Sequence, residues 1–155
     1  MSPILDITDL SVVYRTQGAD VRAVEQVNLS LSAGEVVGLC GESGSGKSTL
    51  AYGATRLLRP PALVTSGSVR YSGRRITSGG DPVDLMVMNR RDLHALRWRE
   101  IAIVFQSAMN ALNPVLRVRD QLEDAIRAHL RLPRDKVREK AATLLDQTPA
   151  GGELR

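Results

Sequence analysis

The sequence predicts an α/β fold, and three observations support that prediction. Two segments near the start, 4–14 and 21–31, alternate loosely between apolar and polar residues, as strands do. A continuous apolar run at 35–40 is typical of a strand buried on both faces. A loop rich in glycine and serine follows this run and leads into a helical segment, 47–58.

Turn residues separate the first elements, at 17–20 and at 33–34. After the helical segment, which Arg59-Pro60-Pro61 closes, the pattern predicts a short strand, a loop, a basic helix, a second buried strand and two more helices. In chain order these elements are 67–73, 78–82, 90–99, 101–105, 118–132 and 134–147.

Length and composition indicate one soluble globular domain. The chain has 155 residues, of which 43% are hydrophobic and 25% are charged. A net charge of +4 is mild and does not by itself predict a nucleic-acid partner. The start lacks the basic and apolar regions of a secretory signal, and no apolar run approaches the roughly 20 residues of a membrane helix.

Cysteine and histidine chemistry is not predicted. Cys40 is the only cysteine, which excludes an internal disulfide framework and a Cys-rich metal site. Its place in the apolar run predicts a small buried hydrophobic residue and indicates a reducing compartment. His94 and His129 lie on helical segments without a Cys/His cluster, so neither is a predicted metal ligand.

The strongest motif is Gly41-x-x-x-x-Gly46-Lys47-Ser48, a complete P-loop pattern. Glycines let successive backbone N–H groups approach phosphate oxygens, and a helix start adds further donors. A lysine supplies a charge for the β- and γ-phosphates, and a serine hydroxyl can ligate Mg²⁺. The predicted nucleotide-binding residues are Gly41, Glu42, Ser43, Gly44, Ser45, Gly46, Lys47, Ser48 and Thr49, the last for the α-phosphate.

The alternative for this segment is a flexible surface loop, which the flanking strand and helix patterns disfavour. A P-loop alone leaves kinases, GTPases, helicases and transporter ATPases open.

The stretch LDITDLSVVY…VRAVEQVNLSLSAGEVVGLCGESGSGKSTL closely resembles the nucleotide-binding subunits of ABC transporters. In that family an aromatic residue near the end of the first strand stacks on adenine, and Tyr14 occupies this place. Without the resemblance, Tyr14 would be interpreted as a strand residue that fills the core.

A second stretch, REIAIVFQSAMNALNPVLRVRDQL, is similar to the family's Q-loop region. The resemblance implies that Gln106 reaches Mg²⁺ and the attacking water, and that 107–120 meets a short helix of a membrane subunit. ALNPVLRV is most similar to the dipeptide, oligopeptide and nickel importer branch. SGSVRYSGRRI is similar to the family's connecting hairpin, while the longer 78–89 stretch is predicted to be a surface loop.

The resemblance covers 4–146 and implies a P-loop NTPase fold of the ABC type: an antiparallel β subdomain plus the start of a parallel core sheet, truncated before the signature motif. Residues 1–155 would form the N-terminal portion of a nucleotide-binding domain. An LSGGQ-type signature, an apolar strand ending in Asp-Glu and the switch histidine are not found. Lys47 and Gln106 would therefore assist an incomplete catalytic set.

The resemblance also implies ATP and Mg²⁺ as ligands, with transmembrane permease subunits and a second nucleotide-binding subunit as partners. The protein would be peripheral, on the cytoplasmic face of the membrane, and would couple ATP hydrolysis to import of a small solute such as peptides. The chain alone is expected to bind nucleotide weakly, to hydrolyse little or none, and to dissolve poorly because of an exposed sheet edge.

Two alternatives remain open. One is an ABC-type ATPase that acts on nucleic acid through a basic stripe, although a solvated helix face is favoured and no nucleic acid is expected. The other is an inactive fragment. The residues of the stripe are Arg90, Arg91, Arg97, Trp98 and Arg99.

Overall fold

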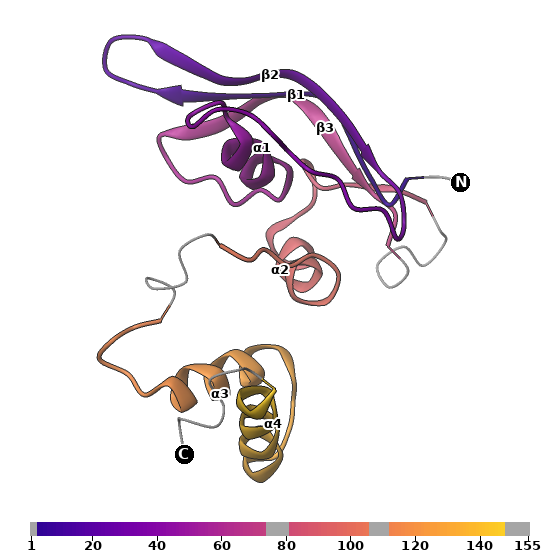
Figure 1. Ribbon diagram of the computed structural model, residues 1–155. Coiled ribbons are helices and arrows are strands. Elements are labelled where there is room, and N and C mark those ends of the chain that lie inside the picture. Colours follow the sequence, from indigo (N-terminus) through magenta and orange to yellow (C-terminus); the bar gives the residue numbers. More distant parts are fainter. Residues whose placement is uncertain (1–2, 74–80, 106–111, 148–155) are drawn as a thin grey trace. The chain divides into compact units, whose positions relative to one another are not determined.

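The structure is a computed structural model that describes residues 3–73, 81–105 and 112–147 (Figure 1). The chain divides into two compact units, Met1–Ile101 and Ala102–Arg155. Strands and two helices make up the first unit, and a helical hairpin makes up the second. Among the residues described, no helix is both long enough and apolar enough to cross a membrane.

The first unit is built on an antiparallel sheet with the strand order β2-β1-β3-β4. The central strand β1 places Leu5 opposite Leu31 of β2 on one side and opposite Tyr71 of β3 on the other. The strands are β1 (Leu5–Arg15), β2 (Asp20–Leu31), β3 (Ala62–Tyr71) and β4 (Val83–Asp84).

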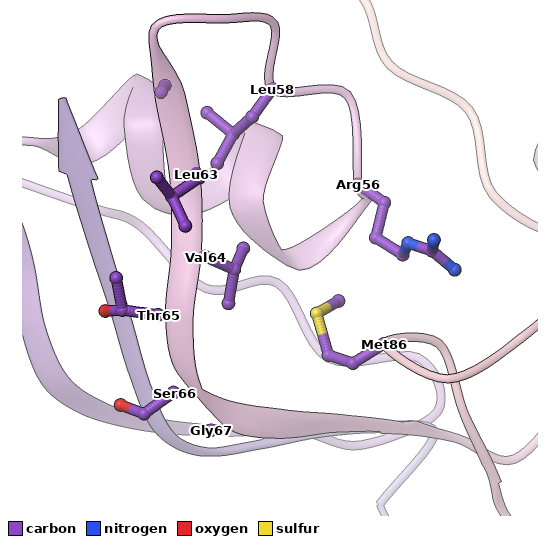
Figure 2. Close-up of a pocket in the computed structure, with 9 residues that line it drawn as sticks. Arg56, Leu58, Leu63, Val64, Thr65, Ser66, Gly67 and Met86 are labelled. Carbon is purple, nitrogen blue, oxygen red and sulfur yellow. The ribbon is translucent and has the colours of Figure 1, made fainter. Parts of the chain in front are cut away.

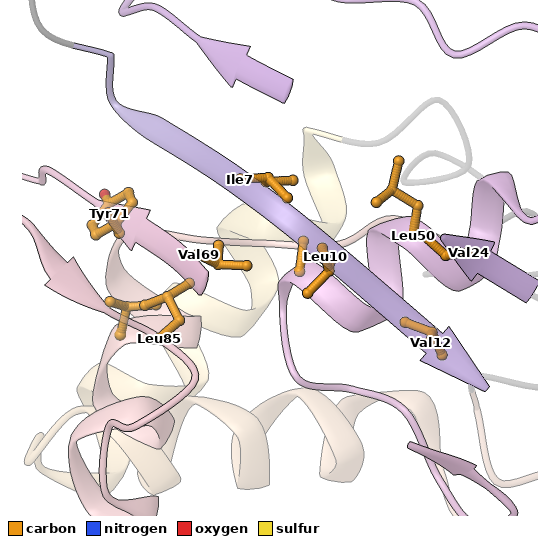
Figure 3. Packing of buried hydrophobic residues seen from close by; sticks show 10 residues of the cluster. Ile7, Leu10, Val12, Val24, Leu50, Val69, Tyr71 and Leu85 are labelled. Atoms are coloured by element: carbon orange, nitrogen blue, oxygen red, sulfur yellow. The ribbon is translucent and has the colours of Figure 1, made fainter. Parts of the chain in front are cut away.

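Two helices accompany the sheet, α1 (Lys47–Ala54) and α2 (Arg90–Arg99). Helix α1 contacts β1, β2 and β3, and it lies along the sheet in Figure 1. Ten buried side chains of the first unit form one apolar cluster, shown in Figure 3. Its members are Ile7, Leu10, Val12, Val24, Leu50, Ala54, Val69, Tyr71, Leu85 and Leu96.

A bulge interrupts the pairing of β1 with β3 between Thr8 and Ser11. Gly67 of β3 faces it with a φ of 98°, and a Cβ there would lie only 2.5 Å from the Leu10 Cα. Asp9 also has a positive φ, of 50°. The bulge therefore depends on a glycine at 67.

The second unit consists of α3 (Val118–His129) and α4 (Arg134–Asp146). Ile126, Val137 and Ala141 are buried between the two helices, and Leu122 packs against them. Helix α3 ends at His129, before the predicted end at 132, so Pro133 does not itself end it. Pro133 immediately precedes α4, and the predicted separation of the two helices is confirmed.

Most predicted elements are confirmed, including β1, β2, α2, α3 and α4. Helix α1 is shorter than predicted, since it ends at Ala54 rather than at residue 58. Strand β3 begins at Ala62, before the predicted start at 67. The expected surface loop at 78–89 is wrong in part, because Val83 and Asp84 pair with β3; 78–80 lie outside the described residues.

The two predicted buried strands, 35–40 and 101–105, are wrong: neither segment is a strand in the structure. Val36 and Val104 are each 96% exposed. Cys40, predicted to be buried, is exposed as well. A strand buried on both faces needs hydrogen-bonded neighbours, and neither segment has a paired strand among the described residues.

Candidate functional site

Three glycines shape the loop that precedes α1. Gly41, Gly44 and Gly46 have φ values of 153°, 82° and 89°. Gly46 is the residue that caps the amino end of α1, in a left-handed conformation. A Cβ at Gly46 would lie 2.3 Å from the Ala23 carbonyl oxygen, so the turn into the helix requires glycine at this position.

The Lys47 side chain binds oxygen atoms of the loop that precedes it. Its Nζ atom donates to the Gly41 carbonyl oxygen at 2.8 Å, to the Glu42 carbonyl oxygen at 2.5 Å and to the Ser45 Oγ at 3.1 Å. The loop is thus wrapped around the ammonium group of Lys47, a residue that is half-buried as a whole. An ammonium held by neutral oxygens keeps its positive charge available to an anion.

The first turn of α1 divides its side chains between solvent and core. Ser48 is exposed, whereas Thr49 and Leu50 are buried. The hydroxyl oxygens of Tyr14 and Thr49 lie 3.1 Å apart and share a hydrogen bond. Tyr14, predicted to stack on adenine, is therefore hydrogen-bonded to the helix that begins at the loop, and the residue is half-buried.

A cavity of about 360 Å³ opens beside the loop. Gly41, Ser45, Gly46 and Lys47 line it on the loop side. The remaining lining residues come from β2, the preceding segment and α1: Ala23, Val24, Glu25, Val27, Leu39, Cys40 and Leu50. The lining therefore combines glycine backbone, the Lys47 cation, the Glu25 carboxylate and an apolar wall. Small-ligand sites generally combine an apolar lining with a few polar groups.

A larger cavity, of about 460 Å³, lies near the other end of α1 (Figure 2). Arg56, Leu58, Val64 and Met86 are among its lining residues. It contains no residue of the glycine loop, so volume alone does not identify the site.

Gln106, the predicted Q-loop glutamine, lies outside the described residues, as do the next five residues. The following segment exposes apolar side chains: Leu112 is 47% exposed, Val115 88% and Leu116 51%. Gln121 of α3 holds this segment, since its amide accepts from the Asn113 N–H at 2.8 Å and donates to the carbonyl oxygens of Asn113 and Leu116.

The basic stripe predicted on α2 is not one continuous solvent-facing surface. Arg90, Arg91 and Arg99 are exposed, but Arg97 is half-buried and donates to the carbonyl oxygens of Thr55 and Arg56. Burial lowers the pKa of Arg97, and the nearby charge of Arg56 lowers that pKa further. The surface available to a nucleic acid is correspondingly reduced.

The sequence did not indicate that Arg97 donates to the carbonyl oxygens of Thr55 and Arg56, or that Arg56 donates to those of Leu85 and Met88. In a linear sequence, an arginine at the end of a helix cannot be distinguished from any surface arginine. The acceptors of Arg56 and Arg97 lie between 29 and 42 positions away from them. The one signal in the sequence was the absence of a glycine directly after α1, because helices often end at a glycine.

No protein-only metal centre is present in the described parts of the chain, where no three His, Cys, Asp or Glu side chains form a group that could hold an ion. The exposed Ser48 hydroxyl at the amino end of α1 suits Mg²⁺, which typically takes few protein ligands together with phosphates and waters.

Known proteins resemble this chain in sequence and in fold. Residues 24–153 match the family model described as ABC transporter. The chain is 40% identical over 146 residues to a "Putative peptide import ATP-binding protein" of Brucella abortus (strain 2308) and to one of Brucella suis biovar 1 (strain 1330), covering 94% of this chain. It spans only 41% of the length of these two relatives.

Solved structures show the same fold. The chain superposes with a TM-score of 0.72 on an ATP-binding cassette determined as a dimer in a post-hydrolysis state with ADP and Pi, at 24% identity. The match covers 92% of this chain and 56% of that one. A second dimeric structure, of a bacterial ABC transporter cassette, gives the same values. The chain belongs to the ABC transporter family.

Proposed function

We propose that the chain binds MgATP through residues 41–48, and that in the whole protein the binding and hydrolysis of ATP drive the import of a small solute, in particular peptides. One observation supports this most directly: in a chain of the ABC transporter family, a loop with three positive-φ glycines encloses the Lys47 ammonium at the start of a helix. Backbone donors, a helix start and one cation together fit a polyphosphate.

Each loop residue has a defined part in this proposal. The Lys47 Nζ now lies against the carbonyl oxygens of Gly41 and Glu42, and it would exchange these for β- and γ-phosphate oxygens. The exposed Ser48 hydroxyl would hold Mg²⁺. Mg²⁺, when bound, neutralises charge that develops on the phosphates.

Adenine would stack on Tyr14, whose hydroxyl already reaches the first turn of α1. Thr49 would contact the α-phosphate, and Gln106 would reach Mg²⁺ and the attacking water. Residues 1–155 would form the N-terminal portion of the nucleotide-binding domain.

Peptide import is proposed because the relatives named above carry that activity in their names. The partners would be transmembrane permease subunits and a second nucleotide-binding subunit, with the protein peripheral on the cytoplasmic face of the membrane. The exposed apolar residues Leu112, Val115 and Leu116, held in place by Gln121, offer a surface for a permease helix.

Calorimetric titration with MgATP tests the nucleotide half of the proposal. The wild-type chain is expected to give a saturable heat, and Lys47→Ala is expected to remove it. Lys136→Ala is the matched control, since this lysine is paired with Glu139 on α4, outside the loop. Equal binding by wild type and Lys47→Ala would contradict the proposal.

Uptake of a labelled peptide tests the transport half. Cells whose only copy of the complete transporter carries Lys47→Ala are expected to lose ATP-dependent uptake, while Lys136→Ala cells retain it. Unchanged uptake with Lys47→Ala would contradict import driven by this loop.

A further inference from the structure

The turn that ends α1 has an arginine, Arg56, at a position where glycine is usual. The Leu57 N–H donates to the Tyr52 carbonyl oxygen at 2.8 Å, and the Arg56 N–H donates to the Gly53 carbonyl oxygen at 3.0 Å. This pair of bonds defines a Schellman ending, whose left-handed position is normally filled by glycine. Arg56 occupies it with a φ of 54°. An arginine here suggests that its side chain has a role that glycine could not supply.

The Arg56 side chain reaches the segment that leads into α2. Its Nη1 donates to the Leu85 carbonyl oxygen at 2.9 Å and to the Met88 carbonyl oxygen at 2.6 Å. In Figure 2 the guanidinium extends away from the apolar side chains of Leu58 and Val64. Met88 immediately precedes Asn89, the residue that caps the amino end of α2.

Arg97, in the last turn of α2, donates hydrogen bonds back to the residues that follow α1. Its Nε and Nη2 donate to the Thr55 carbonyl oxygen at 3.2 and 2.9 Å, and Nη2 also donates to the Arg56 carbonyl oxygen. These carbonyls follow the end of α1, where a cation is favourable. No carboxylate in the described part of the chain forms a salt bridge with Arg56 or Arg97, so backbone carbonyls are the partners that the two guanidinium groups have there. We name Arg56 and Arg97 the arginine brace.

We propose that Arg97, with Arg56, is a positioning residue that links phosphate binding at the amino end of α1 to the position of α2. The inference rests on the proposed function, since it takes the loop at 41–48 as the phosphate site.

The proposed link between the two ends of α1 depends on the shortness of this helix and on its contacts with the sheet. Its eight residues form about two turns of helix, and in this proposal they shift together. Phosphate would bind at the amino end of α1. At the carboxyl end, the arginine brace links α1 to the segment before α2 and to the last turn of α2, through four carbonyl acceptors. Helix α2 is the last element before Gln106 in the sequence. Binding at the loop and the placement of α2 would therefore be reciprocally linked.

Two signals from the same protein test the proposal. Calorimetry measures MgATP affinity, and fluorescence of Trp98, the only tryptophan, reports on α2. The variants are Arg97→Met, Arg97→Lys and the control Arg99→Met, which removes the same charge from an exposed position of the same helix.

We expect MgATP to change Trp98 emission in the wild type and in Arg99→Met. Arg97→Met should bind MgATP about tenfold more weakly, the scale of one charge-assisted hydrogen bond, and should show no emission change at saturation. Arg97→Lys should recover only part of both signals, because an ammonium lacks the fork geometry of a guanidinium. If Arg97→Met does not fold by circular dichroism, Arg97→Lys alone decides.

Two results would overturn the inference while leaving the proposed function intact. One is wild-type binding without any change in Trp98 emission, and the other is an Arg97 variant that binds and responds like the wild type. Absence of MgATP binding by the wild type would instead contradict the proposed function, and this inference with it.

Discussion

Tyr14 connects the first strand to the helix of the glycine loop through the hydrogen bond between its hydroxyl and that of Thr49. The proposed contact with adenine uses a different part of the same side chain, the face of the ring. The two roles can therefore be separated by substitution.

Tyr14→Phe retains the ring and loses the hydroxyl, whereas Tyr14→Ala loses both. Stacking of one base on an aromatic ring is worth roughly 1–3 kcal/mol, so we expect Tyr14→Ala to weaken MgATP binding by about one to two orders of magnitude. Tyr14→Phe should stay within about threefold of the wild type, because the ring face is unchanged. Titration calorimetry measures both. Equal weakening by the two substitutions would assign the effect to the hydroxyl rather than to stacking.

Tyr71 is a second residue whose environment sets a measurable property. Its side chain is buried at the end of β3, and its hydroxyl donates to Glu100 Oε2 at 2.8 Å. Burial, the hydrogen bond to Glu100 and the charge of that carboxylate together raise the pKa of Tyr71 to about 12. The other Glu100 oxygen is buried without a partner among the described residues.

The raised pKa predicts a specific loss of stability in alkali. Because the folded state holds the Tyr71 proton more tightly than the unfolded state does, the stabilisation is complete below pH 10 and is lost as the pH rises towards 12. Urea unfolding of wild type and Tyr71→Phe at a series of pH values measures the difference. The free energy of unfolding of the wild type should fall more steeply over this range. Parallel curves for the two proteins would contradict the assignment.

At the scale of elements, the hairpin of α3 and α4 is organised by one buried acid. Glu123 is 6% exposed. Its Oε2 lies 2.5 Å from the Arg127 Nη2, and its Oε1 lies 3.8 Å from the Nε atoms of Arg119 and Arg138. Since Arg138 belongs to α4, the carboxylate links the two helices as well as two turns of α3.

Removing that charge should destabilise the hairpin. Glu123→Gln keeps the shape but leaves three arginines facing one another, and we expect a loss of about 1–3 kcal/mol. Glu139→Gln is the matched control, because its pair with Lys136 is exposed and should contribute less than about 1 kcal/mol. Urea unfolding followed by circular dichroism compares them. Equal stability of the two variants would show that Glu123 does not organise the hairpin.

Elements whose partners are local were predicted well, and those that depend on distant neighbours were not. Helix α2 was predicted with its observed ends from apolar residues that recur at helical spacing. In the structure Asn89 caps its amino end, which is also a local interaction. The runs at 35–40 and 101–105 have strand-like composition, but pairing depends on segments elsewhere. Helix α1 ended early because Arg56 adopts a conformation that its residue type does not predict.

At the scale of the whole molecule, the loop at 41–48 could be identified from sequence because its conformation depends on its own glycines. The arginine brace could not, because Arg97 and its acceptor Thr55 are 42 positions apart. The family, supported by 40% identity to the relatives, agrees with the resemblance of the opening stretch.

The proposed phosphate site depends most on the loop's backbone amides, and titration with MgATP followed by amide proton–nitrogen correlation spectra tests them directly. We predict saturable shifts centred on the amides of Gly44, Gly46, Lys47 and Ser48 in the wild-type chain, and no saturable shifts in Lys47→Ala. Saturable binding with its largest shifts elsewhere, or the same shifts in both proteins, would contradict the central claim.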